Sequence, residues 1–173
     1  MTLRAVAVEV GVTPMAIYRH FRDKDALVEA LVQAGFARWE TRLARAARKR
    51  KPLAQIEGAL LAYAEFALDE PNTFELMFLV RRANVPEAPR SLAMSPSPSF
   101  SRLIDAVRMA MEQGALARDD PTEVILLAWA TAHGLIALHF SGRFGWNNRK
   151  FRQLHARVIR RLLRGLAPGV VRD

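Results

Sequence analysis

Cysteine is absent from this sequence of 173 residues. The chain therefore cannot form disulfide bonds, bind zinc through thiolates or use a cysteine nucleophile, and it suits a reducing compartment. The N-terminal stretch MTLRAVAVEV also lacks the basic segment followed by a long apolar run that marks a signal peptide. We therefore expect a cytoplasmic protein.

The patterns of several function classes are missing as well. The sequence shows no strand-like alternation of useful length, no internal repeat and no glycine-rich phosphate loop. Its four histidines do not have metal-ligand spacing. Candidate nucleophiles and bases are scattered singly, whereas a catalytic site needs them to converge. We expect neither an enzyme nor a bound metal or cofactor.

Hydrophobic residues are not scarce. They make up 51% of the chain, which is enough for a real core and excludes a disordered tail. The length fits one ordinary domain, or a small head on a larger body. Apolar residues recur with helical spacing along almost the whole chain, so we predict an all-α fold.

Acidic residues are few at both ends, and this distribution says more than the net charge of +9. Residues 1–51 contain 11 Lys and Arg against 5 Asp and Glu, and residues 143–173 contain 9 against 1. Residues 52–142 reverse the balance, with 6 against 11. A basic N-terminal part suits a polyanionic partner such as nucleic acid. Arginine-rich helices that are simply solvated would give the same counts.

Cap and stop signals divide the chain into eight predicted helices. The third, which we expect to present Leu27, Ala30, Leu31 and Ala34 as an apolar stripe, is long enough to leave one core and enter another. The Pro- and Ser-rich stretch 84–99 is predicted to be a mobile loop. The predicted helices span residues 3–10, 14–21, 23–49, 53–69, 72–82, 99–117, 122–142 and 148–166.

The stretch GVTPMAIYRHF, residues 11–21, carries its own stop and start signals. Gly11 can take the left-handed conformation that closes a helix. Thr13 followed by Pro14 provides a hydroxyl cap and a ring already fixed at a helical φ. Two helices joined by a short turn that begins with glycine form the helix-turn-helix pattern, whose second helix enters the DNA major groove. An ordinary corner between two helices of a bundle would have the same spacing. The pair is predicted to pack through Val6, Val10, Val12, Ile17 and Phe21.

The longer stretch GVTPMAIYRHFRDKDALVEAL strongly resembles the TetR family of bacterial transcriptional regulators. The family's signature runs from a glycine turn through a Tyr-x-x-Phe helix to a Lys-x-x-Leu helix start. The resemblance implies a helix-turn-helix DNA-binding domain over residues 1–47 and a ligand-binding and dimerisation domain over residues 48–173, joined by a long helix. The matching positions are Gly11, Val12, Tyr18, Phe21, Lys24 and Leu27.

The resemblance also implies which side chains contact double-stranded DNA. Arg19 is the side chain best suited to pair with a guanine. A phosphate contact or a surface salt bridge would also explain an arginine at this position. Family members carry a further helix before the two helices of the helix-turn-helix, and this sequence begins at the equivalent of their second helix. We therefore expect the apolar side of the two helices in residues 3–21 to be partly exposed to solvent. The implied phosphate ligands are Thr13, Tyr18 and Lys24, and the implied groove-facing residues are Pro14, Met15, Arg19 and His20.

The chain carries no charge from Val124 to Gly142, which is long enough to raise the question of a membrane span. Polar residues such as His133 and His139 interrupt this run, so a buried or interface helix explains it better, and we expect no membrane.

The segment ILLAWATAHGLIALHF, residues 125–140, resembles one C-terminal subclass of the TetR family through Trp129, His133 and Gly134. The resemblance implies that the last two helices form a four-helix bundle with a second copy of the chain. The predicted interface consists of Leu135, Leu138, Phe151, Leu154, Val158 and Leu162.

Aromatic and sulfur-containing side chains on the middle helices are candidates for a ligand pocket, although a plain core would use the same residues. The predicted lining is Phe66, Phe74, Met77, Phe78, Met109, Trp129 and His133.

The resemblance thus implies a ligand-responsive transcriptional regulator that binds a palindromic operator as a homodimer. By family habit it would be a repressor, released by a small apolar or amphipathic effector. A helical adaptor that binds proteins and not DNA is the alternative.

Overall fold

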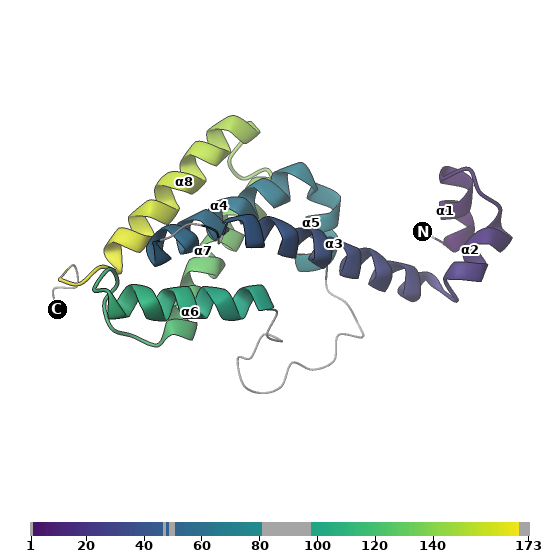
Figure 1. Ribbon diagram of the computed structural model, residues 1–173. Helices are drawn as coiled ribbons and strands as arrows, with labels where there is room; N and C mark the ends of the chain where they lie inside the picture. The colour runs from purple at the N-terminus through teal and green to yellow at the C-terminus, as the bar shows by residue number, and fades with distance from the viewer. Residues whose placement is uncertain (1, 47, 49–50, 81–97, 170–173) are drawn as a thin grey trace. The chain divides into compact units, whose positions relative to one another are not determined.

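The computed structural model describes residues 2–46, 48, 51–80 and 98–169, and eight α-helices account for most of them (Figure 1). No strand occurs within these ranges, and the predicted all-α fold is confirmed. Most of the predicted loop 84–99 falls outside the described residues. The helices are α1 Leu3–Glu9, α2 Pro14–His20, α3 Lys24–Ala46, α4 Pro52–Asp69, α5 Pro71–Phe78, α6 Pro98–Glu112, α7 Pro121–Phe140 and α8 Asn148–Gly165.

The chain divides into two compact units, Met1–Arg38 and Trp39–Asp173. The division falls inside α3, so this helix contributes its first part to the smaller unit and its last part to the larger unit. The domain boundary predicted after residue 47 follows the end of the same helix, and it stays a prediction.

Helix boundaries follow local chemistry. The carboxylate of Asp120 accepts hydrogen bonds from the backbone N–H groups of Thr122 and Glu123, at 2.7 and 3.2 Å, and so caps the start of α7. The predicted end of α6 at residue 117 is wrong. This helix ends at Glu112, because Gly114 takes a φ of 69° that reverses the chain.

The smaller unit is held by a compact apolar cluster in which Leu3, Ala7 and Ile17 are buried. Two of the predicted packing residues do not join it. Val10 is 62% exposed and Val12 is 43% exposed, because both belong to the turn rather than to the facing sides of the helices. Leu3 and Ala7 of α1 take their place.

The apolar stripe predicted for α3 is also wrong in part. Leu31 is 47% exposed and Ala34 is exposed, whereas Val32 is buried. Apolar residues lie on several sides of this helix, so spacing alone did not identify the side that is covered.

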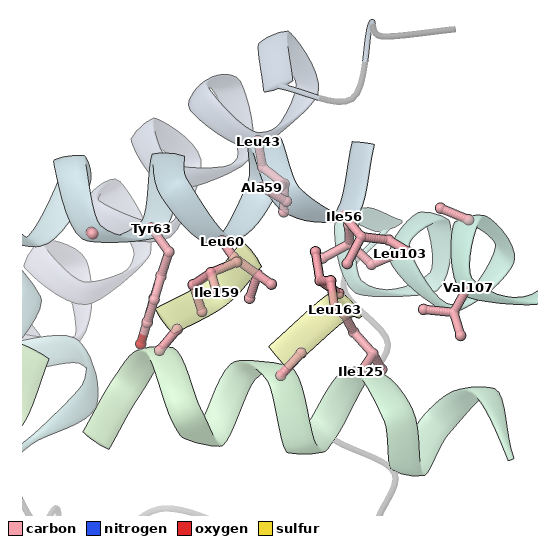
Figure 2. Packing of buried hydrophobic residues seen from close by; sticks show 14 of the residues in the cluster. Leu43, Ile56, Ala59, Leu60, Tyr63, Leu103, Val107, Ile125, Ile159 and Leu163 are labelled. Atoms are coloured by element: carbon pink, nitrogen blue, oxygen red, sulfur yellow. The ribbon is translucent and has the colours of Figure 1, made fainter. Parts of the chain in front are cut away.

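The larger unit is built around α4, which contacts α5, α6, α7 and α8. Figure 2 shows Ile56 and Leu60 of α4 packed with Ile125 of α7 and with Ile159 and Leu163 of α8, and all five are buried. Complete burial of such a side chain contributes about 1.5–3 kcal/mol. This shared core fixes α4, α7 and α8 against one another.

Helix α7 is the one described helix that is long and apolar enough to cross a membrane, and a core helix passes the same test. Its apolar composition has a local explanation, since one side of it is buried in the larger unit. The buried residues are Val124, Ile125, Ala128, Ala132 and Ile136.

Candidate nucleic-acid interface and aromatic core

A tight turn and a cap place α2 against α1. Gly11 adopts a φ of 71°, and the N–H group of Val12 donates to the carbonyl oxygen of Ala7 at 2.9 Å. The hydroxyl oxygen of Thr13 then accepts from the N–H group of Ala16 at 3.2 Å. Because the turn and the cap are both satisfied locally, α2 is a short helix with a fixed start.

One side of α2 is anchored and the rest is open to solvent. Ile17 is the buried residue of this helix. Met15 is 68% exposed and Tyr18 is 53% exposed, although large apolar and aromatic side chains are usually covered. Arg19 and His20 are exposed beside them. A rigid helix with this mixed face offers cations for phosphates and apolar and polar groups for base edges.

The first and last predicted DNA contacts along the chain are also accessible to solvent. Lys24 is exposed at the start of α3, where the carboxylate of Asp23 caps the helix by accepting from the N–H group of Ala26 at 2.8 Å. Thr13 is exposed, and Pro14 is half-buried. Six of the seven predicted contacts are therefore exposed in the smaller unit.

Tyr63 lies at the centre of an aromatic cluster in the larger unit. Its ring centroid is 5.3 Å from that of Trp39 on α3, 5.1 Å from that of Phe74 and 5.5 Å from that of Phe78 on α5. His133 of α7 completes the cluster at 6.3 Å. Such ring pairs add about 0.5–1.5 kcal/mol each beyond the area that they bury.

The cluster has a polar group at its centre, the Tyr63 hydroxyl, which accepts a hydrogen bond from the indole of Trp129. The hydroxyl oxygen of Tyr63 and Nδ1 of His133 lie 3.0 Å apart, within hydrogen-bonding distance. Burial raises the pKa of the Tyr63 hydroxyl and lowers the pKa of His133, because an apolar surrounding disfavours the charged form of each. The pair is therefore neutral near pH 7 and can exchange hydrogen bonds with a polar group of a ligand.

Most of the predicted pocket residues come together in or beside this cluster. Phe66 and Phe74 are fully buried, whereas Met77, Phe78, Trp129 and His133 are half-buried. Met109 is 47% exposed on α6. Sequence reasoning missed Trp39 and Tyr63. Tyr63 could have been found from its spacing to Phe66, since the two lie one helical turn apart on α4. Trp39 had no such signal, because it falls within residues 1–47, the predicted DNA-binding domain.

The predicted interface residues fall into two groups. Leu138 is 45% exposed, and Leu135, Leu154, Val158 and Leu162 are half-buried. Phe151 is fully buried in its own chain, where its ring stacks on that of His139 at 4.2 Å. Phe151 is therefore a core residue and has no surface to offer a second copy. The exposed side of α7 also carries Leu127, Ala130 and Gly134.

Ion pairs explain part of the uneven charge distribution. Arg152 and Arg160 of the basic helix α8 pair with Glu65 and Glu57 of α4, each at 2.8 Å. These pairs are partly exposed, so each contributes at most about 1 kcal/mol. They show that some of the acidic groups in the middle of the chain serve to dock α8.

Among the described residues of the larger unit, His155 is the polar residue that is buried. It is 1% exposed, and neither ring nitrogen has a hydrogen-bond partner among the described residues. Burial lowers its pKa to about 4, so the ring is neutral at pH 7. Among the described residues, no group of three His, Asp or Glu side chains is placed to hold a metal ion.

Two family models match the chain. The model described as "Bacterial regulatory proteins, tetR family" matches residues 1–31. The model described as "Tetracyclin repressor-like, C-terminal domain" matches residues 56–162, which is more than half of the chain. The two matches lie in the smaller and the larger unit, respectively.

Solved structures with the same fold include three that are informative. A Rhodococcus protein of unknown function is 29% identical with a TM-score of 0.76, and the match covers 96% of this chain and 85% of that one. A TetR family transcriptional regulator of Thermus thermophilus is 16% identical with a TM-score of 0.70, over 98% and 88% of the two chains. A ketosteroid transcriptional regulator of Mycobacterium tuberculosis is 18% identical with a TM-score of 0.58, over 96% and 85%.

Proposed function

The chain belongs to the TetR family of DNA-binding transcriptional regulators, and we propose that it is a cytoplasmic repressor that a small ligand releases from its operator. Family members bind DNA and are generally not enzymes. The observation that carries the proposal is the open face of α2, where Met15, Tyr18, Arg19 and His20 are exposed on a helix fixed by a cap and a buried anchor.

In the proposed complex, α2 lies in the major groove. Thr13, Tyr18 and Lys24 hold phosphates, because a hydroxyl group or an ammonium group binds them without reading sequence. Arg19 is the reading residue, since its planar guanidinium matches the O6 and N7 atoms of guanine. Pro14, Met15 and His20 contact neighbouring base edges.

The proposed effector site is the aromatic cluster around Tyr63 and His133. Its rings favour an apolar or amphipathic body, and the polar pair favours a ligand with one group that forms hydrogen bonds. Trp39 links this site to α3, which continues into the smaller unit. A ligand that prefers one position of α3 over another would therefore change the affinity for DNA.

The proposed homodimer forms through the exposed side of α7 and the adjoining residues Leu154, Val158 and Leu162 of α8. The α7 side is uncharged between Leu127 and Leu138, and its middle carries Ala130 and Gly134, which allow close approach of a second helix. Two copies related by a two-fold axis would present two reading helices, so the operator is palindromic.

The test is selection of duplexes from a randomised pool by the purified chain, followed by titration of the selected sequence. We expect enrichment of a palindrome that binds at least about a thousandfold more tightly than random DNA. A chain that enriches no sequence and yet captures protein partners at the same salt concentration would be an adaptor, and the regulator proposal would be wrong.

A further inference from the structure

A groove at one end of the larger unit plays no part in the proposed function. It lies between the first turn of α4, the connection from α6 to α7 and the last turns of α8, and it is an open groove with a volume of about 330 Å³. Its floor includes Leu53, the buried Leu163 and Ala167. Its polar side is formed by Arg160, Arg164 and Glu57.

Both arginines are held in place through one nitrogen. Nε of Arg160 donates to Oε1 of Glu57 at 2.8 Å, and Nε of Arg164 donates to the carbonyl oxygen of Arg160 at 3.2 Å. Within the described part of the chain, the Nη groups of these two side chains have no further partner. Two guanidinium groups one helical turn apart therefore present N–H donors that are already oriented.

The charge of the groove is small and positive. Glu57 balances Arg160, so one positive charge, that of Arg164, has no counterpart among the lining residues. A polyanion would leave most of its charge unpaired here, and it would gain nothing from the apolar floor. A molecule with one negative group and an apolar chain matches both the charge and the floor.

The groove stays open in the proposed dimer. Arg160 and Val158 are two positions apart, which places them about 200° apart around the helix. Arg160 points to α4, as its bond to Glu57 shows, and Val158 belongs to the proposed interface on the other flank of α8. Occupation of the groove and dimerisation therefore do not compete.

We propose that this groove binds an amphipathic monocarboxylate, with its head on the free edges of Arg164 and Arg160 and its chain over Leu53 and Leu163. The cavity lies at the small end of the range of about 300–1,000 Å³ that is usual for ligand sites, which suits a medium-length chain. An acidic lipid headgroup shares this chemistry, and the experiment below separates it from the free acid. This site is separate from the effector site proposed above and does not depend on it.

The experiment is calorimetric titration of the full chain with decanoate and with 1-decanol, which has the same chain and no charge. We expect decanoate to bind at one site and Arg164→Gln to weaken it roughly tenfold or more, as the loss of a charge-assisted hydrogen bond does. Arg161→Gln is the matched control, because this neighbouring arginine does not line the groove. It should leave the affinity unchanged.

Two further variants locate the site. Ala167→Phe fills the groove and should abolish decanoate binding, whereas Tyr63→Phe alters the aromatic cluster and should have no effect. Equal weakening by Arg164→Gln and Arg161→Gln, or equal affinity for decanoate and 1-decanol, would overturn the proposal, as would undetectable binding. Loss of binding in Tyr63→Phe alone would move the acid to the aromatic cluster. Binding to phosphatidylglycerol vesicles but not to free decanoate would assign the arginines to a membrane surface instead.

Discussion

The hydroxyl oxygen of Tyr63 and Nδ1 of His133 lie 3.0 Å apart and join α4 to α7 inside the aromatic cluster. Trp39 of α3 packs edge-on against the same tyrosine ring at 5.3 Å. Trp39, on the helix that continues into the smaller unit, is thus in contact with the tyrosine whose hydroxyl group lies within hydrogen-bonding distance of His133. Any ligand that displaces Tyr63 also changes the surface on which Trp39 rests.

Tyr63→Phe should lower the free energy of unfolding by about 1–3 kcal/mol. The substitution keeps the ring and removes the hydroxyl group, so Nδ1 of His133 loses its partner in a half-buried place. Urea denaturation measures the loss. His133→Leu in the Tyr63→Phe background should then cost less than His133→Leu alone. Fully additive effects would contradict a bond between the two side chains.

His155 should make the protein less stable in weak acid. The unfolded chain binds a proton with the usual pKa of 6.5, whereas burial lowers the pKa in the folded state to about 4. Between these values the unfolded state holds more protons, so the free energy of unfolding falls as the pH falls. The free energy of unfolding falls by about 1.4 kcal/mol per pH unit in this range, and by roughly 3 kcal/mol in total. This group has no effect above pH 6.5.

His155→Leu should remove that pH dependence and raise stability at pH 7 by about 1–3 kcal/mol, because both buried ring nitrogens are without partners among the described residues. Chemical denaturation at several pH values between 4 and 8 measures both effects. His20→Gln, at an exposed histidine of α2, is the control and should leave the profile unchanged. An unaltered acid profile in His155→Leu would show that another group causes the loss.

The helix-turn-helix could be predicted from the sequence because its signals are local. Gly11 and Thr13 fix the turn and the cap through bonds within a few residues, so type and spacing are sufficient. The packing across the turn was less predictable. Val10 and Val12 are apolar and yet exposed because they flank Gly11 in the turn, whereas Leu3 and Ala7 are buried, and apolar spacing alone does not separate the two pairs.

The aromatic core was only partly predictable because it assembles from distant segments. Trp39 on α3 and Tyr63 on α4 meet across helices that the sequence pattern does not place relative to one another. For α8 the pattern predicted an apolar stripe that contains both Phe151 and Leu154. These two side chains are about 60° apart around the helix, and Phe151 is the one that is fully buried in the core. Tertiary packing decided which of the two neighbours was covered.

Leu154→Asp together with Val158→Asp should convert the proposed dimer into a folded monomer. Both side chains are half-buried at the flank of α8, where burial against a second copy would leave a carboxylate without water. Light scattering at micromolar concentration measures the mass. Gln153→Asp, at an exposed position of the same helix, is the control and should remain dimeric. A double variant that stays dimeric would place the interface elsewhere.

Phe151→Asp should instead unfold the larger unit, because its ring is fully buried in its own chain. A buried carboxylate without a partner costs several kcal/mol. Circular dichroism separates this outcome from dissociation of an intact dimer. A well-folded monomeric Phe151→Asp would mean that this ring belongs to the interface.

Lys24→Ala and Arg19→Ala should weaken DNA binding in different ways. Lys24 is an exposed cation at the start of α3, and a phosphate contact acts on all sequences alike. Its loss should weaken binding to the operator and to random duplexes alike. It should also lower the number of counterions released on binding, and so the salt dependence of the affinity, by about one. Arg19→Ala should lower affinity for the operator by about 1–3 kcal/mol while random DNA is affected less, because a base contact discriminates.

Titration of both duplexes at two salt concentrations separates these roles. Arg4→Ala, which removes an exposed cation of α1 outside the reading helix, is the control and should retain the preference for the operator. If Arg19→Ala weakens both duplexes equally, Arg19 is a phosphate ligand and the base is read by Met15 or His20, its exposed neighbours on α2. If neither Lys24→Ala nor Arg19→Ala changes binding, then α2 is a corner between packed helices, and another surface of the chain contacts DNA.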